Sequence, residues 1–286
     1  MLKTMNKLPL HKASQYSEYG VVLHHFDSNG ISHVPVSYAH QDDYYVLGLL
    51  TQGRACGIID FKELQLTAGD VFLIRPGQVH RFVSSESAEG WLLMADSKFV
   101  GAEEKCIFDN FSLSASSFKI DEKRKKELRV LSFLLEHRVN ESKEQQANTV
   151  ISHLTEAFIA VVAEAVQEVN SLQTSLSPRQ IEIVLSFRKL LTEHLSKNRQ
   201  PSYYASLLNI STVYLNEVVK KVTGMNTALY IKGEVVLQAK RLLCNTTLSV
   251  KQIADRLGFD DVSCFSRLFS NAAGVSPVAF RQKSLD

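Results

Sequence analysis

The last third of the chain contains one segment twice. Apolar, small and turn-forming residues recur at a spacing of 49 residues and, after one inserted residue, at a spacing of 50. The matched pairs are Ala205 and Ala254, Leu208 and Leu257, Asn209 and Gly258, Ile210 and Phe259, Leu215 and Phe265, Val218 and Leu268, Val219 and Phe269, Gly224 and Gly274, and Tyr230 and Phe280. We therefore expect both copies to fold as the same supersecondary unit.

Each copy is typical of a helix-turn-helix. Ala205 and Ala254 stand where the first helix would cross the second, and a larger side chain there would push the two helices apart. Asn209 and Gly258 stand at the turn, where a left-handed backbone is needed. An α-solenoid is the alternative explanation for paired helices. Solenoids need about three or more repeats, however, and here two copies occur with a long segment between them.

That segment, Thr227–Cys244, predicts a single helix. Its 18 residues span about 27 Å at 1.5 Å per residue. Adjacent major-groove segments on one side of DNA are about 34 Å apart, one helical turn. The spacing therefore favours two hairpins that each place a recognition helix in neighbouring groove segments.

Charge is distributed unevenly along the chain. Residues 1–177 contain 17 Lys and Arg against 22 Asp and Glu, whereas residues 178–286 contain 15 against 8. A basic C-terminal part beside an acidic remainder indicates that the C-terminal part meets a polyanion.

Before about residue 100 the pattern changes to short apolar runs separated by Gly, Pro and Asp. The expected strands are Tyr44–Leu50, Ala55–Phe61, Asp70–Ile74 and Gly90–Ala95. Turn signals lie at Gly53, at Ala68-Gly69-Asp70 and at Pro76-Gly77. Such runs predict a compact all-β barrel or sandwich over about residues 21–99.

Two amphipathic helices are expected next, over residues 121–138 and 144–170. The apolar stripes consist of Leu128, Leu131, Leu134 and Leu135 in the first helix, and of Val150, Ile151, Leu154, Phe158, Val161, Val162 and Ala165 in the second. Two interpretations stay open: the stripes pack on the barrel, or one of them meets its copy in a twofold homodimer. Ser177 followed by Pro178 predicts the start of the next helix and the domain boundary.

The sequence gives little support for a zinc-binding, disulfide-rich, secreted or membrane protein. The four cysteines, Cys56, Cys106, Cys244 and Cys264, form no CxxC pair and predict neither a zinc knuckle nor a disulfide framework. The N-terminal residues lack a signal-peptide apolar region, and Ala157–Val166, which contains Glu164, is shorter than a membrane span. We therefore expect a cytoplasmic protein that does not insert in membranes.

The C-terminal motifs closely resemble the signature of AraC/XylS-type transcriptional regulators. The matching segments are Ala239-Lys240-Arg241-Leu242-Leu243, Ser249-Val250-Lys251-Gln252-Ile253-Ala254, Leu257-Gly258-Phe259, Phe265-Ser266-Arg267-Leu268-Phe269 and Gly274-Val275-Ser276-Pro277. The β unit is similar to the cupin-like sensor domain of many members, through Gly69-Asp70, Pro76-Gly77 and His80. The resemblance is strong over residues 179–281 and moderate before them.

This resemblance implies that the helices Ser211–Lys221 and Asp261–Asn271 read bases. The matching outward positions are Val213, Asn216 and Glu217 in the first helix, and Val262, Ser263, Ser266 and Arg267 in the second. Arg267 could pair with guanine and Asn216 with adenine, each through two hydrogen bonds. Lys220, Lys221 and Lys251 are candidate phosphate contacts. Glu217 stands where many members have a basic residue; it either accepts from cytosine, repels phosphate, or is only a solvated surface residue.

Cupin folds also include metal enzymes, so catalysis needs to be considered. Such sites resemble a set of three His and one carboxylate with open coordination positions. Here Tyr38 and His40 occupy the His-x-His pattern and His80 fits the later ligand, which leaves two of four ligands unless Asp42 or Asp43 substitutes. Metal catalysis is therefore disfavoured, and no metal or other cofactor is expected.

The open end of a β-barrel can instead bind a small molecule reversibly. Candidate residues that line an effector pocket are His40, Tyr45, Arg54, His80 and Trp91, although each could have a structural role instead. The resemblance implies a sugar-like or other small effector, or none at all.

We expect an α+β protein with an effector domain (1–120), connecting and dimerisation helices (121–176) and a double helix-turn-helix domain (177–286). The predicted function is sequence-specific binding of double-stranded DNA. The resemblance favours an activator, which would also contact RNA polymerase. The alternatives are a metal-dependent cupin enzyme fused to a DNA-binding domain, and a helical adaptor that binds no duplex.

Overall fold

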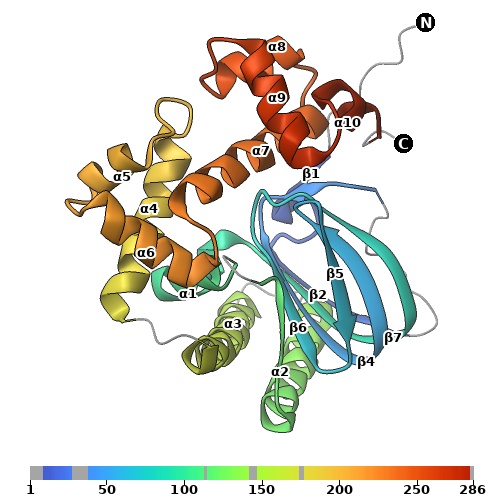
Figure 1. Ribbon diagram of the computed structural model, residues 1–286. Coiled ribbons are helices and arrows are strands. Elements are labelled where there is room, and N and C mark those ends of the chain that lie inside the picture. Colours follow the sequence, from blue (N-terminus) through green and yellow to red (C-terminus); the bar gives the residue numbers. More distant parts are fainter. Residues whose placement is uncertain (1–8, 28–37, 113–114, 142–146, 174–176, 284–286) are drawn as a thin grey trace, which may run out of the picture. The chain divides into compact units, whose positions relative to one another are not determined.

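The computed structural model describes residues 9–27, 38–112, 115–141, 147–173 and 177–283. The chain divides into two compact units, one of residues 9–174 and the other centred on residues 175–286 (Figure 1). The first unit is rich in strands and the second is helical, so the overall class is α+β as expected.

The first unit is built on an antiparallel sheet in the order β2-β7-β4-β6-β8, with β5 also paired to β4. The strands are β2 (Val21–Phe26), β4 (Tyr45–Ile59), β5 (Lys62–Thr67), β6 (Asp70–Ile74), β7 (His80–Ala95) and β8 (Ser117–Lys119). Two short strands, β1 (Leu10–His11) and β3 (Gln41–Asp42), form a separate parallel pair. Short 3-10 turns lie at Ala13–Gln15 and Ser97–Phe99.

The predicted turn at Gly53 is wrong, because β4 runs continuously through it. Gly53 has φ +72°, and a Cβ there would lie 2.1 Å from the carbonyl oxygen of Ser87 on β7. The pairing of β4 with β7 shifts register on both sides of Gln52. A bulge of this kind bends and twists a strand without ending its pairing, so Gly53 marks a bend in the sheet.

Three helices accompany the sheet: α1 (Ala102–Phe111), α2 (Glu122–Glu141) and α3 (Ala147–Gln173). Leu128 and Leu135 of α2, and Phe158 and Val162 of α3, are at most 1% exposed and share one core with β2, β4, β6 and β7. The predicted stripes therefore pack on the sheet, which favours the first of the two interpretations. Leu134 and Val150, predicted in the stripes of the first and second helix, are instead exposed.

Helix α3 is apolar enough over Thr149–Val169 to cross a membrane by length and composition. Its buried side chains, among them Ile151, Phe158 and Val166, belong to the core of the sheet unit. Packing in that core accounts for its apolar character.

The second unit contains the duplication. Its helices are α4 (Pro178–His194), α5 (Pro201–Leu207), α6 (Thr212–Thr223), α7 (Thr227–Asn245), α8 (Val250–Arg256), α9 (Val262–Ala273) and α10 (Pro277–Lys283). Helices α5 and α8 have 7 residues each, and α6 and α9 have 12 each. The predicted repeat is thus confirmed as two equal hairpins, with α7 as the helix between them (Figure 1).

Helix ends follow local sequence signals. Ser177 caps α4 and forms a capping box with Gln180, with Pro178 in the first helical position, as expected. Gly224 and Gly274 end α6 and α9 in the left-handed conformation, at φ +73° and +74°.

Candidate functional site

The turns of the two hairpins have the same backbone geometry. Asn209 and Gly258 have φ +54° and +77°, as the sequence predicts. The residue after each turn donates its amide to the carbonyl of the crossing alanine, at 3.0 Å to Ala205 and 2.9 Å to Ala254. Both alanines are at most 2% exposed. Each turn therefore sets its second helix, α6 or α9, at the same place in the hairpin.

Helix α6 has a buried face and an exposed face. Its buried residues are Leu215, Val218 and Val219. Val213, Glu217 and Lys220 are exposed and follow one another at intervals of four and three residues, so they lie on one side of the helix. Lys221 is exposed beside them, with its Nζ 3.5 Å from Gln180 Oε1.

Asn216 does not suit the role of an adenine reader. Its Oδ1 accepts a hydrogen bond from the backbone amide of Thr227 at 3.0 Å, and the side chain is half-buried. Reading adenine through two hydrogen bonds needs both the oxygen and the amide group of Asn. Asn216 instead satisfies an amide in the first turn of α7 that has no partner within the helix.

Helix α9 presents a second exposed face. Val262, Ser263 and Arg267 are exposed and Ser266 is half-buried, whereas Phe265 is fully buried in the hairpin core. The spacing of the four outward residues is that of one side of a helix. The second predicted set of base readers is thus brought together.

Arg267 makes two contacts within α9. Its Nε lies 3.4 Å from the carbonyl oxygen of Ser263, and one terminal nitrogen lies 3.6 Å from Cys264 Sγ. The contact to Ser263 is at the long end of hydrogen bonding, and the Arg267 side chain is exposed. Lys251 is exposed in the first turn of α8.

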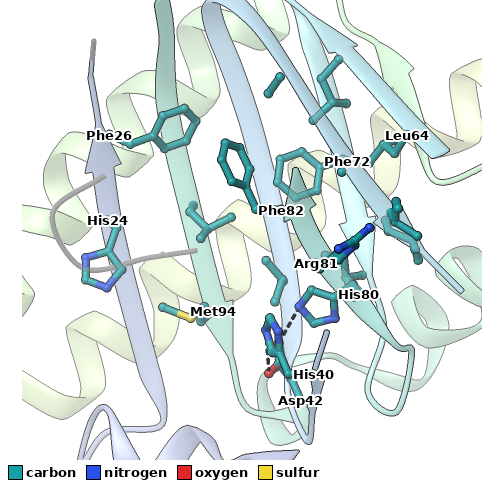
Figure 2. A pocket seen from close by; sticks show the side chains of 18 of the residues that line it. His24, Phe26, His40, Asp42, Leu64, Phe72, His80, Arg81, Phe82 and Met94 are labelled. Carbon is teal, nitrogen blue, oxygen red and sulfur yellow. Dashed lines mark ion pairs between the residues drawn. The ribbon is translucent and has the colours of Figure 1, made fainter. Parts of the chain in front are cut away.

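The first unit contains a cavity of about 140 Å³ on the side of the sheet opposite the helices. Aromatic and aliphatic side chains such as Phe26, Leu64, Phe72 and Phe82 lie toward one end, and a polar group that includes His40 lies toward the other (Figure 2). Apolar groups make up most of the lining. The cavity is therefore a pocket with one polar end.

Asp42 lies at the centre of the polar end. Its carboxylate oxygens lie 3.2 Å from His80 Nε2, 3.8 Å from His40 Nε2 and 3.6 Å from His11 Nδ1. The side chain of Asp42 is 2% exposed, and its Oδ1 has no hydrogen-bond donor among the described residues. Figure 2 shows His40 and His80 next to each other beside this carboxylate, with the two contacts marked by dashed lines.

Oxygen atoms of Tyr38 and Gln78 orient the imidazole rings of His11, His40 and His80 around Asp42. His40 Nδ1 lies 3.1 Å from the carbonyl oxygen of Tyr38, and His80 Nδ1 lies 3.1 Å from that of Gln78. A carbonyl oxygen only accepts, so these Nδ1 atoms carry the protons. His11 Nε2 lies 3.1 Å from the Tyr38 hydroxyl. Each ring therefore turns its other nitrogen toward Asp42.

Burial and the neighbouring His80 lower the pKa of His40 to about 4. His40 is consequently neutral at neutral pH, with a lone pair on Nε2. Burial and the adjacent Asp42 carboxylate raise the pKa of Tyr44. The polar end thus places the Asp42 carboxylate beside a neutral His40.

Of the five predicted pocket residues, His40 and His80 line the cavity. Tyr45 and Trp91 do not, because side chains alternate along a strand and both of these contact the core beneath the helices. Arg54 is exposed and lies outside the lining.

Sequence reasoning missed several pocket residues, among them His11, His24 and the phenylalanines. For Asp42 a signal existed: it stands two residues after His40, and such residues share one face of an extended chain. For His11 there was none, since it comes close only through the pairing of β1 with β3.

Two family models match the chain. A helix-turn-helix domain matches residues 204–283, and an AraC-like ligand binding domain matches residues 30–95. The first range contains the second hairpin and all of the first from Tyr204 onward, and the second range contains His40, Asp42 and His80.

Among curated relatives, the Msm operon regulatory protein of Streptococcus mutans is 24% identical over 98% of this chain and 99% of its own length. The arabinose operon regulatory protein of Escherichia coli is 23% identical over 83% of this chain and 80% of its own length. The HTH-type transcriptional activator RhaR of Cronobacter sakazakii is 23% identical over 85% of this chain and 86% of its own length.

Proposed function

Since the chain is a transcriptional regulator of the AraC type, with a helix-turn-helix DNA-binding domain and an N-terminal ligand-binding domain, we propose that it activates transcription when α6 and α9 bind adjacent major-groove segments. The supporting observation is the pair of equal hairpins with exposed outer faces. Activation, which implies contact with RNA polymerase, is supported by the relative named as an activator. We assign the protein to the cytoplasm, where it would reach DNA.

We assign DNA binding to residues 177–286, effector binding to residues 1–120 and dimerisation to residues 121–176. In α9, Val262, Ser263, Ser266 and Arg267 would contact base edges, and in α6 Val213 and Glu217 would do so. Lys220, Lys221 and Lys251 would contact phosphates, where charge matters more than geometry. We propose regulation by binding and not catalysis, since the relatives carry the names of regulators.

Replacement of Lys220 by Ala should weaken binding to all duplex sequences alike. If Lys220 neutralises one phosphate, the slope of log affinity against log salt should become less negative by about 0.9. Gel-shift titrations of the full chain on genomic fragments at several salt concentrations measure both effects.

The control is Lys62→Ala, which removes the same charge from exposed β5 and should leave the slope unchanged. A chain that binds no fragment more tightly than bulk DNA at any salt concentration would contradict the proposed function. An unchanged slope for Lys220→Ala would contradict only this phosphate contact.

The effector is proposed to have a largely apolar body and one polar group. A polyhydroxylated sugar would leave most of its hydroxyls without partners against walls such as Phe72, Phe82 and Leu92, at a cost of about 1–3 kcal/mol for each buried group. Compounds of the apolar kind should raise the melting temperature of the full chain in proportion to the logarithm of their concentration. Stabilisation by sugars alone would contradict this chemistry.

Such a ligand regulates only if its affinity differs between two arrangements of the protein. Gel shifts with and without the compound that stabilises the chain test this point. Equal DNA affinity and equal site preference in both conditions would mean that the pocket is not regulatory.

A homodimer is proposed through the exposed face of α2. Val130, Phe133 and Leu134 are 59%, 63% and 46% exposed, and their spacing places them on one side of the helix. Exposed apolar groups of this size gather at protein interfaces, and a twofold axis would bring the face against its own copy.

Phe133→Glu should convert the dimer into a monomer. A central aromatic residue in an interface commonly contributes 2 kcal/mol or more, so the dissociation constant should rise by roughly 30-fold or more. Sedimentation of the full chain over a concentration series measures it. Val83→Glu, at an exposed apolar position of β7, is the matched control. Equal dissociation constants for the two variants would place the interface elsewhere.

A further inference from the structure

Asp42 Oδ1 is a buried carboxylate oxygen without a hydrogen-bond donor among the described residues. Leaving a buried charged acceptor unsatisfied is costly, and native proteins generally pair such atoms or use them as ligands. The nearest side-chain nitrogens belong to His11 and His40, at 3.6 and 3.8 Å. These contacts are too long for good hydrogen bonds, so a different partner is needed.

The distances match those between ligands of one metal ion. Zinc bonds of about 2.0–2.1 Å in tetrahedral geometry separate the ligand atoms by about 3.3–3.4 Å. Asp42 Oδ1 lies 3.6 Å from His11 Nδ1 and 3.8 Å from His40 Nε2, and the other carboxylate oxygen, Oδ2, lies 3.2 Å from His80 Nε2. One nitrogen each of His11 and His40 and one oxygen of Asp42 also lie within 4.8 Å of one another.

The orientation of the imidazole rings also suits metal binding. Metal-bound imidazoles usually donate their other N–H to an oxygen, which fixes the tautomer and aims the lone pair. His40 and His80 do so through the carbonyl oxygens of Tyr38 and Gln78, and His11 Nε2 lies beside the Tyr38 hydroxyl. Tyr38 thus orients two rings at once.

We propose that His11, His40, His80 and Asp42 bind one divalent transition-metal ion, with Zn²⁺ the best fit. Three imidazoles and one carboxylate are donors that Zn²⁺ accepts in tetrahedral sites, whereas Ca²⁺ and Mg²⁺ prefer oxygen ligands. The ligands come from β1, β3, β7 and the residue that bridges to β7, so the ion joins segments far apart in the chain. The proposal does not depend on the identity of the effector or on DNA binding.

Four protein ligands make a closed site. Catalytic zinc keeps one position open for water or substrate, whereas structural zinc has four protein ligands and contributes directly to folding stability. The ion would therefore hold β1 against β3 at the polar end of the cavity. This role differs from that of a metal-dependent enzyme, which needs an open coordination position.

The test is titration of the chelator-treated full chain with Zn²⁺ by calorimetry, and with Co²⁺ by visible absorption. We expect one equivalent to bind, a tetrahedral Co²⁺ spectrum, and a rise in melting temperature that EDTA reverses. Asp42→Asn removes the anionic ligand at constant shape and should weaken Zn²⁺ binding at least 100-fold. Tyr38→Phe, which removes only the group that holds His11, should weaken it 10- to 100-fold.

His153→Ala is the control, because His153 is exposed on α3, far from these residues in sequence, and pairs with Glu156 at 3.4 Å. The Zn²⁺ affinity of this variant should equal that of the parent. Should Asp42→Asn fail to fold, His11→Gln carries the same expectation at a less buried ligand. Failure to bind one equivalent, an octahedral Co²⁺ spectrum, or parental affinity in the folded ligand variants would each overturn the proposal. DNA affinity measured by gel shift without metal tests the proposed function separately.

Discussion

Gly258→Ala is expected to destabilise the second hairpin by about 2–5 kcal/mol. Gly258 has φ +77°, where a residue with a Cβ costs about 1–2 kcal/mol. In addition, a Cβ there would lie 1.8 Å from the carbonyl oxygen of Ser196, which is backbone and cannot rotate away. Forced displacement in a packed region costs about 1–3 kcal/mol more.

The neighbours of Gly258 explain why this strain cannot relax. Arg199 donates hydrogen bonds to the carbonyl oxygens of Leu257 and Gly258, at 3.3 and 2.8 Å. Its guanidinium also stacks on the Phe259 ring at 3.8 Å. The turn is thereby fixed against the segment between α4 and α5, and a shift of the turn would break these contacts and move α9.

The first hairpin supplies the matched control. Asn209 occupies the equivalent turn at φ +54° but is exposed, and Asn tolerates the left-handed conformation. Asn209→Gly should therefore be nearly neutral, whereas Gly258→Asn should remain costly because the approach of Ser196 is unchanged. Hydrogen exchange of the full chain, followed over residues 201–283, measures local opening of each hairpin. A Gly258→Asn variant as protected as the parent would show that the close approach does not matter.

The helical unit was predictable because its signals are local. Ser211 and Gly224 bound α6, and Asp261 and Gly274 bound α9, at positions where a capping side chain or a left-handed residue is needed. The repeat adds independent support, since each copy predicts the other. The sequence did not predict that Asn216 accepts a hydrogen bond, because this bond comes from the backbone amide of Thr227 in the next helix.

The sheet unit was less predictable because its decisive features are not local. The run Tyr44–Leu50 is apolar throughout, so its sequence does not indicate which side chains face the cavity and which face the helices. Tyr44 and Tyr45 therefore could not be told apart, although Tyr44 lines the cavity and Tyr45 packs under α1 near Phe108, with 6.1 Å between ring centres. Likewise β7 begins at His80, ahead of the expected Gly90.

The proposed metal ligands illustrate the same limit. His40 and His80 were visible from motif spacing, but the fourth donor, His11, is 31 residues from Asp42 and reaches it through a two-residue parallel pairing. Contacts of this kind depend on the path of the whole chain. The sequence thus indicated an incomplete set of ligands where the structure brings four donors together.

Arg267→Ala is expected to weaken binding to the preferred operator by about 1–3 kcal/mol and to relax preference at one base pair. The guanidinium is exposed on α9, and its contact to the carbonyl oxygen of Ser263, at 3.4 Å, is a weak one to exchange for a base edge. Selection of bound sequences from a random pool, followed by gel-shift titration, measures both quantities.

Arg267→Lys separates base reading from phosphate contact. A guanine is read through two parallel hydrogen bonds from the planar guanidinium, which the compact ammonium of Lys does not reproduce in the same geometry. If Arg267 reads a base, the Lys variant should lose preference at the same base pair that the Ala variant loses, while retaining part of the affinity through its charge. If Arg267 contacts phosphate, Lys should restore affinity for all sequences and neither variant should change the preferred sequence. That second pattern would move base reading in α9 to Val262, Ser263 and Ser266, because these are the other outward residues of the helix.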